Sequence, residues 1–174
     1  MLTEITRESL ILQATNNQKL LVTPAINFVI INGKMNEQPD EINLAKMAME
    51  FVLKQNNNAA GLAAPQVGSK YSWFVMACEP NIMVVNPSII GRMGSKQDIE
   101  GCFSVRGLYK VKRATSVTLE YWALNLNSNK LERRTKNYNG FNARVVQHEY
   151  AHLMGVTLPL VGNPITLLNS GDKR

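Results

Sequence analysis

The sequence predicts an α+β fold in which a mixed or antiparallel β-sheet packs around one late helix. Two segments have apolar residues at helical spacing, one beginning at Pro39 and one near Phe141. Between them lie short β-branched or alternating runs bounded by Gly, Pro and Asn, as is typical of strands joined by turns. Helices and strands that are segregated along a chain in this way are typical of α+β proteins.

The length and composition predict a single domain that spans residues 1–174. Of the 174 residues, 45% are hydrophobic and 18% are charged, and there are no internal repeats. No apolar run approaches the ~20 residues of a membrane helix, and the acidic N-terminal residues do not resemble a secretory signal. We therefore expect a cytoplasmic protein with no membrane partner. The two cysteines, Cys78 and Cys102, suit a reducing compartment.

Several elements have clear signals. A helix is expected from Pro39 until the run Asn56-Asn57-Asn58, with Asp40 as its N-cap, and a second from Phe141 or Asn142 until Gly155. Asn32-Gly33 predicts a turn after the first strand. Expected strands are residues 26–31, 73–78, 82–85, 108–111, 116–122 and 130–138, of which the last is a polar edge strand.

Four segments lack a clean period. We expect residues 1–24 to be partly ordered and residues 88–104 to form a loop. The small residues of 59–68 suit backbone that lies close to a ligand or to another element. The tail, residues 156–174, is expected to be extended with a frayed end.

The second helix carries both histidines of the protein. His148 and His152 are four residues apart, so on a helix both imidazoles lie on one face and can bind one metal ion. Glu149 directly follows the first histidine, where it can handle the protons of a metal-bound water. One helix supplies two ligands, so a third has to come from elsewhere.

Cys102 is the best candidate for the third ligand. It lies between Gly101 and Phe103 in the expected loop. A thiolate binds first-row divalent metals strongly, and one Cys with two His leaves the fourth position of a tetrahedron open to water. An open position is typical of a catalytic site, because the metal lowers the pKa of its water. The alternative is that this thiol merely packs in the core.

Three segments resemble, in order, the three signature motifs of the peptide deformylases. The similarity extends over about residues 22–156, and three motifs together are far more specific than the HExxH pattern alone. The resemblance suggests a compact, short-tailed member of the family, a form that includes virus-encoded proteins. The segments are Gly61-Leu62-Ala63-Ala64-Pro65-Gln66, Glu100-Gly101-Cys102-Phe103-Ser104 and Gln147-His148-Glu149-Tyr150-Ala151-His152-Leu153.

The resemblance implies a hydrolase that removes the formyl group from the N-terminal formyl-methionine of nascent polypeptides. Cys102, His148 and His152 would bind one divalent metal ion, with Fe(II) as the native metal and zinc, nickel or cobalt as substitutes. A metal-bound water would be the nucleophile.

Other residues take catalytic or substrate-binding roles by the same resemblance. Glu149 would act as general base and then general acid, while Gln66 and the backbone N–H of Phe103 would donate hydrogen bonds to the oxyanion. The backbone at Ala60 and Gly61 would pair with the extended peptide as an added strand. The remaining assignments are Gly101 as a substrate-binding residue, and Phe141 and Val145 around the methionine side chain.

The sequence departs from the family pattern at three places. Ala59 stands where the family has glycine, so a backbone that needs a positive φ would be strained there. Ala151 stands where the family has aspartate, and its absence is expected to free a basic partner such as Arg113 and loosen support of the ligands. The tail after Gly155 is short.

Two alternatives to a deformylase remain at this point. One is another HExxH metallopeptidase, although such enzymes generally take their third ligand downstream of the helix. The other is a non-catalytic, metal-stabilised binding module, which Ala59 and Ala151 favour.

The basic residues suggest a second partner. The net charge is +6, and cationic side chains cluster at residues 106–113 and 130–136. They could dock on ribosomal RNA where the nascent chain emerges, although solvated strand faces explain them at least as well. We expect the protein to be a monomer.

Overall fold

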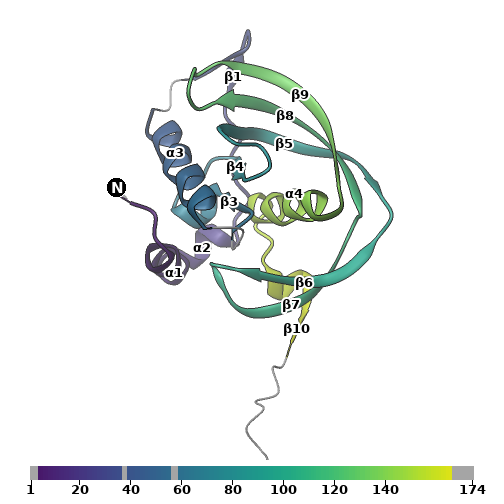
Figure 1. Ribbon diagram of the computed structural model, residues 1–174. Coiled ribbons are helices and arrows are strands. Elements are labelled where there is room, and N and C mark those ends of the chain that lie inside the picture. Colours follow the sequence, from purple (N-terminus) through teal and green to yellow (C-terminus); the bar gives the residue numbers. More distant parts are fainter. Residues whose placement is uncertain (1–3, 37–38, 56–58, 166–174) are drawn as a thin grey trace, which may run out of the picture.

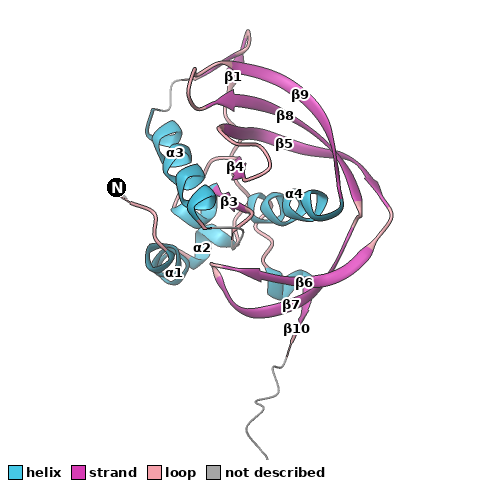
Figure 2. Cartoon of the chain, in the orientation of Figure 1, coloured by secondary structure: helices cyan, strands magenta, loops and turns pink. Residues whose placement is uncertain are grey.

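The computed structural model describes residues 4–36, 39–55 and 59–165, and within them it has the expected α+β fold (Figure 1). The helix α4 (Gly140–Leu153) lies between two antiparallel sheets, as the strands and helices in Figure 2 show. The larger sheet has the strand order β3-β4-β5-β8-β9 and the smaller has the order β10-β7-β6. None of the helices in the described segments is long and apolar enough to span a membrane.

The larger sheet consists of five strands: β3 (Gly61–Ala63), β4 (Trp73–Met76), β5 (Ile82–Met93), β8 (Ser116–Asn125) and β9 (Leu131–Asn139). Alternate residues of β8 are buried, Val117, Leu119 and Tyr121 among them, as the sequence alternation predicts. β9 is confirmed as an edge strand.

The expected loop at residues 88–104 is wrong. β5 continues to Met93 through register shifts after Val85 and Ile89, and β6 (Lys96–Cys102) then pairs with β7 (Val105–Arg113). Most side chains in this stretch are exposed, so the apolar alternation that reveals a strand is missing and only backbone pairing defines it. Cys102 is therefore the last residue of a strand.

Both ends of the chain are more ordered than expected. The N-terminal segment forms α1 (Arg7–Asn16) and α2 (Gln18–Leu21), and the tail forms α5 (Leu158–Val161) and β10 (Gly162–Pro164). α1 has a weak amphipathic pattern and is held by tertiary contacts, which sequence periodicity does not show. Residues 166–174 of the tail lie outside the described residues.

The expected strand at residues 26–31 shortens to β1 (Ile30–Ile31), which pairs with β2 (Lys34–Met35). The turn between them is confirmed, since Asn32 and Gly33 have φ values of 51° and 71°.

The first long helix is α3 (Pro39–Lys54). It begins at Pro39, so Asp40 lies in its first turn and is not the N-cap; the run Asn56-Asn57-Asn58 lies outside the described residues. Gly155, with φ of 70°, is confirmed as the stop of α4.

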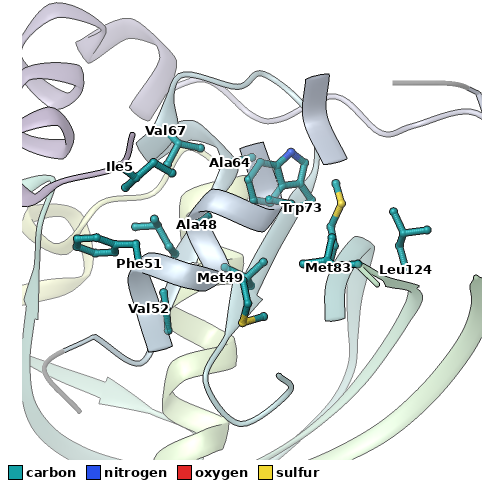
Figure 3. Packing of buried hydrophobic residues seen from close by; sticks show 14 of the residues in the cluster. Ile5, Ala48, Met49, Phe51, Val52, Ala64, Val67, Trp73, Met83 and Leu124 are labelled. Carbon is teal, nitrogen blue, oxygen red and sulfur yellow. The ribbon is translucent and has the colours of Figure 1, made fainter. Parts of the chain in front are cut away.

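The core holds α3 against one face of β3 and β4, and α4 packs near the same strands from the other side. Figure 3 shows the first layer, in which Met49 of α3 meets the strand residues Trp73 and Met83. The Trp73 indole donates a hydrogen bond to the carboxylate of Glu41 at 2.7 Å, so the buried N–H is satisfied. The second layer joins Val146 of α4 to the large sheet. This packing fixes α4 relative to β3.

Candidate active-site cleft

Three candidate metal ligands converge between the two sheets. Cys102 ends β6, while His148 and His152 lie one turn apart on α4, and one ligand atom of each lies within 4.8 Å of the others. The Cys102 Sγ is 3.3 Å from Nε2 of His152. The structure thus brings together the three residues that the sequence selected.

Glu100 orients the first histidine. Its carboxylate accepts a hydrogen bond from Nδ1 of His148 at 3.0 Å, which leaves Nε2 of that ring to bind a metal. Burial would raise the pKa of Glu100, but hydrogen bonds from His148 and Arg113 outweigh it and lower the pKa to about 2. Glu100 and Cys102 lie two residues apart on β6, so they share one face of the strand.

Two arginines complete this arrangement. Arg113 donates to both carboxylate oxygens of Glu100, at 3.0 and 2.9 Å, and Arg144 donates to the same carboxylate at 2.6 Å. The expectation that Ala151 frees Arg113 is therefore wrong, because Glu100 already binds its guanidinium. Sequence reasoning missed Arg144; its position four residues before His148 on α4 was the available signal.

Glu149 is buried against the backbone of β3. Its side chain is 4% exposed and its Oε2 has no hydrogen-bond partner among the described residues. Burial raises its pKa to about 7 even though the adjacent histidines oppose the rise. A Cβ at Gly61 would lie 2.7 Å from Oε1 of Glu149, so a side chain at that position would displace the carboxylate. Glycine at position 61 makes room for the glutamate.

Gln66 reaches the site from the 3₁₀ helix η1 (Ala64–Val67). Its Oε1 accepts a hydrogen bond from the Ala63 N–H at 2.9 Å, which fixes the amide orientation. The Nε2 group then points at Ser104 Oγ, 3.1 Å away, and at Cys102 Sγ, 3.4 Å away. The donor end of Gln66 therefore faces the candidate ligands.

The thiol of Cys102 lies in an electropositive setting. Burial raises its pKa, but the neighbouring His152 and His148 outweigh that effect and bring it down to about 5. Conversely, burial lowers the pKa of His148 while hydrogen bonds to Cys102 and Glu100 raise it to about 10. A thiolate is the form of cysteine that binds metals.

A cleft of about 850 Å³ is lined by Gln66, Cys102, His148 and Glu149, whereas His152 is buried and is not among the lining residues. Its size is typical of a ligand pocket. β3, which forms one wall, is an edge strand of the large sheet, so one side of its backbone is not paired within the sheet. The cleft is lined by all the residues that the sequence assigned to substrate: Ala60, Gly61, Gly101, Phe103, Phe141 and Val145.

Gln147 ties α4 to the connection between β7 and β8, in which Ala114 lies. Its Oε1 accepts from the Ala114 N–H at 3.0 Å, and its Nε2 donates to the Ala114 carbonyl at 2.9 Å.

Ala59, which lies just before the first motif, is 6% exposed and belongs to the cluster around α3. The first motif is thus anchored in the core on one side while Gly61 faces the cleft.

Comparisons with known proteins identify the family of this chain. The family model for polypeptide deformylase matches residues 14–160. The chain belongs to the polypeptide deformylase family. It is 38% identical to peptide deformylase 1 of Clostridium perfringens over 124 residues, covering 67% of this chain and 81% of that protein. It is 43% identical to the peptide deformylase of Dictyoglomus thermophilum over 105 residues, covering 58% of this chain and 64% of that protein.

Solved structures agree with the family. The actinonin-bound class I type b peptide deformylase of Acinetobacter baumannii superposes with a TM-score of 0.66 at 30% identity, covering 80% of this chain and 89% of that chain. The Thermotoga maritima peptide deformylase gives a TM-score of 0.66 at 26% identity, covering 83% and 92%.

The deformylase reading of the sequence is therefore confirmed. The chain is a peptide deformylase, an enzyme of a metal-dependent family that removes the formyl group from nascent polypeptides. The two alternatives, another HExxH metallopeptidase and a non-catalytic module, are not favoured by these comparisons.

Proposed function

We propose that Cys102, His148 and His152 bind one divalent metal ion, and that Glu149 and Gln66 carry out deformylation beside it. The observation that carries this proposal is the convergence of the three ligand atoms within 4.8 Å, beside a buried carboxylate and an amide donor.

The residues fit a tetrahedral metal. Metal–ligand distances of ~2.0–2.3 Å place the ligand atoms of one ion roughly 3.4–3.6 Å apart, close to the 3.3 Å between Cys102 Sγ and His152 Nε2. The lowered pKa of Cys102 supplies a thiolate charge for the cation. Glu100 fixes the ring of His148 with Nε2 free to bind. When bound, the metal polarises the formyl oxygen and lowers the pKa of a water molecule.

Glu149 is the group that moves the proton. Its carboxylate has a pKa of about 7, raised by burial, so it can both accept and release a proton near neutral pH. Its Oε2 is buried without a partner in the described residues, which leaves a basic oxygen for an attacking water. Glu149 would accept the proton of that water and pass it to the amine of the departing peptide.

Gln66 stabilises the negative charge that develops on the formyl oxygen. Its Nε2 carries two hydrogens, one directed at Cys102 Sγ at 3.4 Å and one at Ser104 Oγ at 3.1 Å. With substrate bound, the first hydrogen would turn from the sulfur to the oxyanion while the second keeps Ser104. The Phe103 N–H adds a second donor from the chain segment next to Cys102. One such donor is typically worth ~3–4 kcal/mol in the transition state.

The peptide docks on the edge of β3. The backbone of Ala60 and Gly61 lines the cleft, and β3 has one unpaired side in its sheet. An extended peptide can add there as a further strand and bring its formylated end to the ligands, with Gly101 and Phe103 opposite. Phe141 and Val145 are available for the methionine side chain.

We propose Fe(II) as the native metal, with zinc, nickel or cobalt able to replace it. Thiolate and imidazole ligands suit all of these ions, so the support is the donor set together with the family. Metal analysis of protein purified without oxygen, together with a formate-release assay, tests the proposal. Activity that is lost in air from the native protein but retained in protein loaded with zinc or nickel supports iron; full activity with stoichiometric zinc from the native source contradicts it.

We propose that the protein is a monomer in the cytoplasm and that it meets its substrate at the ribosome. Ion pairs engage several of the basic residues, including Arg133 with Glu120 and Lys136 with Glu79. The basic side chains of β7 remain for an electrostatic contact: Arg106, Lys110 and Lys112. Co-sedimentation with ribosomes that weakens with salt supports docking; binding that is insensitive to salt argues against it.

The role of Glu149 is tested by Glu149→Gln, which keeps the shape and removes the base. We expect formate release from formyl-Met-Ala to fall by at least ~10²-fold while one metal ion per chain is retained. Glu50→Gln, an exposed glutamate on α3, is the control. Unchanged turnover in Glu149→Gln would remove this residue from the mechanism.

A further inference from the structure

The helix α1 has two different faces. Its inner side is held in the core by Leu10, which is fully buried, and by Ile5 just before the helix. The other side lines the active-site cleft with residues spaced by about one helical turn. We name this side the α1 stripe; its residues are Arg7, Ile11, Ala14 and Thr15.

The α1 stripe is fixed next to the catalytic residues. A capping box joins Thr6 and Ser9 and sets the start of the helix directly before Arg7. The guanidinium carbon of Arg7 lies 6.0 Å from the centre of the Phe103 ring, and that ring packs edge-on against Phe51 at 5.5 Å. Phe103 follows Cys102 in the chain, so α1 borders the cleft close to the candidate metal site.

The α1 stripe is positively charged, because it carries Arg7 and no acidic residue. The two acidic residues that line the cleft are Glu100 and Glu149. Glu100 is already bound to Arg113 and Arg144, and Glu149 is buried below Gly61. Within the described segments, Arg7 forms no ion pair with an acidic side chain, and it is exposed at the cleft. A negative group in the cleft would therefore meet an available cation.

We propose that the α1 stripe is a specificity wall for the peptide segment that follows the formyl-methionine, and that Arg7 selects an acidic side chain in that segment. The inference rests on the proposed function. The formylated end has to lie at the ligands, and the β3 edge holds the peptide extended at ~3.3 Å per residue. Side chains that reach Phe103 and Arg7 therefore belong to the first few residues after methionine.

The match to the family model does not include the first two residues of the α1 stripe. It begins at residue 14, so Arg7 and Ile11 precede it, and their contribution comes from this chain's own sequence. Ile11 is 50% exposed beside Arg7. It offers apolar surface for the stem of the acidic residue.

The test is a set of peptides read by formate release. Formyl-Met-Ala-Ala-Ala carries a single Asp or Asn at the second, third or fourth position, and kcat and KM are measured for each peptide. The proteins are wild type, Arg7→Gln, Arg7→Lys and the control Arg92→Gln, whose arginine is exposed on β5 outside the cleft. Thermal unfolding checks that each variant is folded.

For the wild type we expect a kcat/KM about 2- to 5-fold higher for Asp than for Asn at one position, the size of an exposed ion pair. The preference should arise in KM and weaken with salt. Arg7→Gln should abolish it, Arg7→Lys should keep part of it, and Arg92→Gln should match the wild type.

Two outcomes overturn the inference. In the wild type, equal kcat/KM for Asp and Asn at all three positions excludes acidic selection without reference to any variant. A preference that persists unchanged in folded Arg7→Gln assigns the selection elsewhere. Both differ from failure of the proposed function, in which the metal-loaded wild type releases no formate from any of the peptides.

Discussion

Gly61 offers the sharpest test of how this site is built. In the Gly61→Ala variant the new Cβ would lie 2.7 Å from Oε1 of Glu149 and 2.9 Å from its Cγ and Cδ. Ordinary contacts between such atoms begin near ~3.4 Å, so the carboxylate has to move by about 0.5–1 Å. The glutamate is 4% exposed, which leaves it little room to move without displacing its neighbours.

The expected effect is on chemistry rather than on folding. Misplacement of a reacting group by about 1 Å can cost ~10²-fold in rate, so we expect kcat for formyl-Met-Ala to fall by about 10- to 100-fold. The metal content should stay at the wild-type level, because Glu149 is not a ligand. Gly91→Ala on β5 makes the same change outside the cleft, where the new Cβ would lie 3.2 Å from Oγ1 of Thr118, and should leave kcat unchanged.

A double variant makes the reasoning refutable. Asp at position 149 is one methylene shorter and relieves the clash, so Gly61→Ala combined with Glu149→Asp should be no slower than Glu149→Asp alone. Such non-additivity is the mark of residues in direct contact. Wild-type kcat in Gly61→Ala, or simple additivity in the double variant, would show that the glycine does not position the base.

Three further predictions concern stability and metal binding. Glu100→Gln leaves two buried guanidinium groups without their carboxylate, so we expect the free energy of unfolding in urea to fall by about 3–5 kcal/mol. Chelator competition should show a metal affinity that is about 10- to 100-fold weaker. An unchanged affinity would show that Glu100 does not orient His148. Gln147→Ala removes both hydrogen bonds to the Ala114 backbone, which should cost about 1–3 kcal/mol, and a midpoint equal to that of the wild type contradicts this anchor. Removal of the metal by a chelator should lower Tm, because a ligand that binds only the folded state stabilises it; Cys102→Ser should show a much smaller shift, and an equal shift in both proteins would mean that the chelated ion binds elsewhere.

The long helices and the inner strands were predictable because burial leaves a period in the sequence. α3 and α4 carry apolar residues at helical spacing, and β8 alternates buried and exposed positions. The hairpin of β6 and β7 lacks that signal, since its side chains are mostly exposed. α1 has almost no amphipathic pattern and is defined by Leu10 in the core, a contact that depends on distant parts of the chain.

The candidate site was also predictable from local patterns only where its residues are close in sequence. His148, Glu149 and His152 are close in sequence, so helix geometry alone places them on adjacent turns. Cys102 and Gln66 come from distant segments. The metal-binding chemistry of a thiol selected Cys102, whereas the family resemblance connected Gln66 to the helix. The partners of Glu100 were not visible, because ion pairs that join two strands of the small sheet to a helix depend on coordinates.

The sequence by itself determined the donor chemistry: one thiolate, two imidazoles and a glutamate, together with the family whose reaction they serve. The histidines and the glutamate follow from a short spacing on one helix, the thiolate from its residue type, and the family from three motifs taken together. The tertiary structure alone decided that Gly61 makes room for Glu149, that Glu100 binds Arg113, Arg144 and His148 together, and that α1 borders the cleft. Each of these is a contact between segments far apart in the chain, and such contacts are set by how the layers pack, which no local pattern encodes.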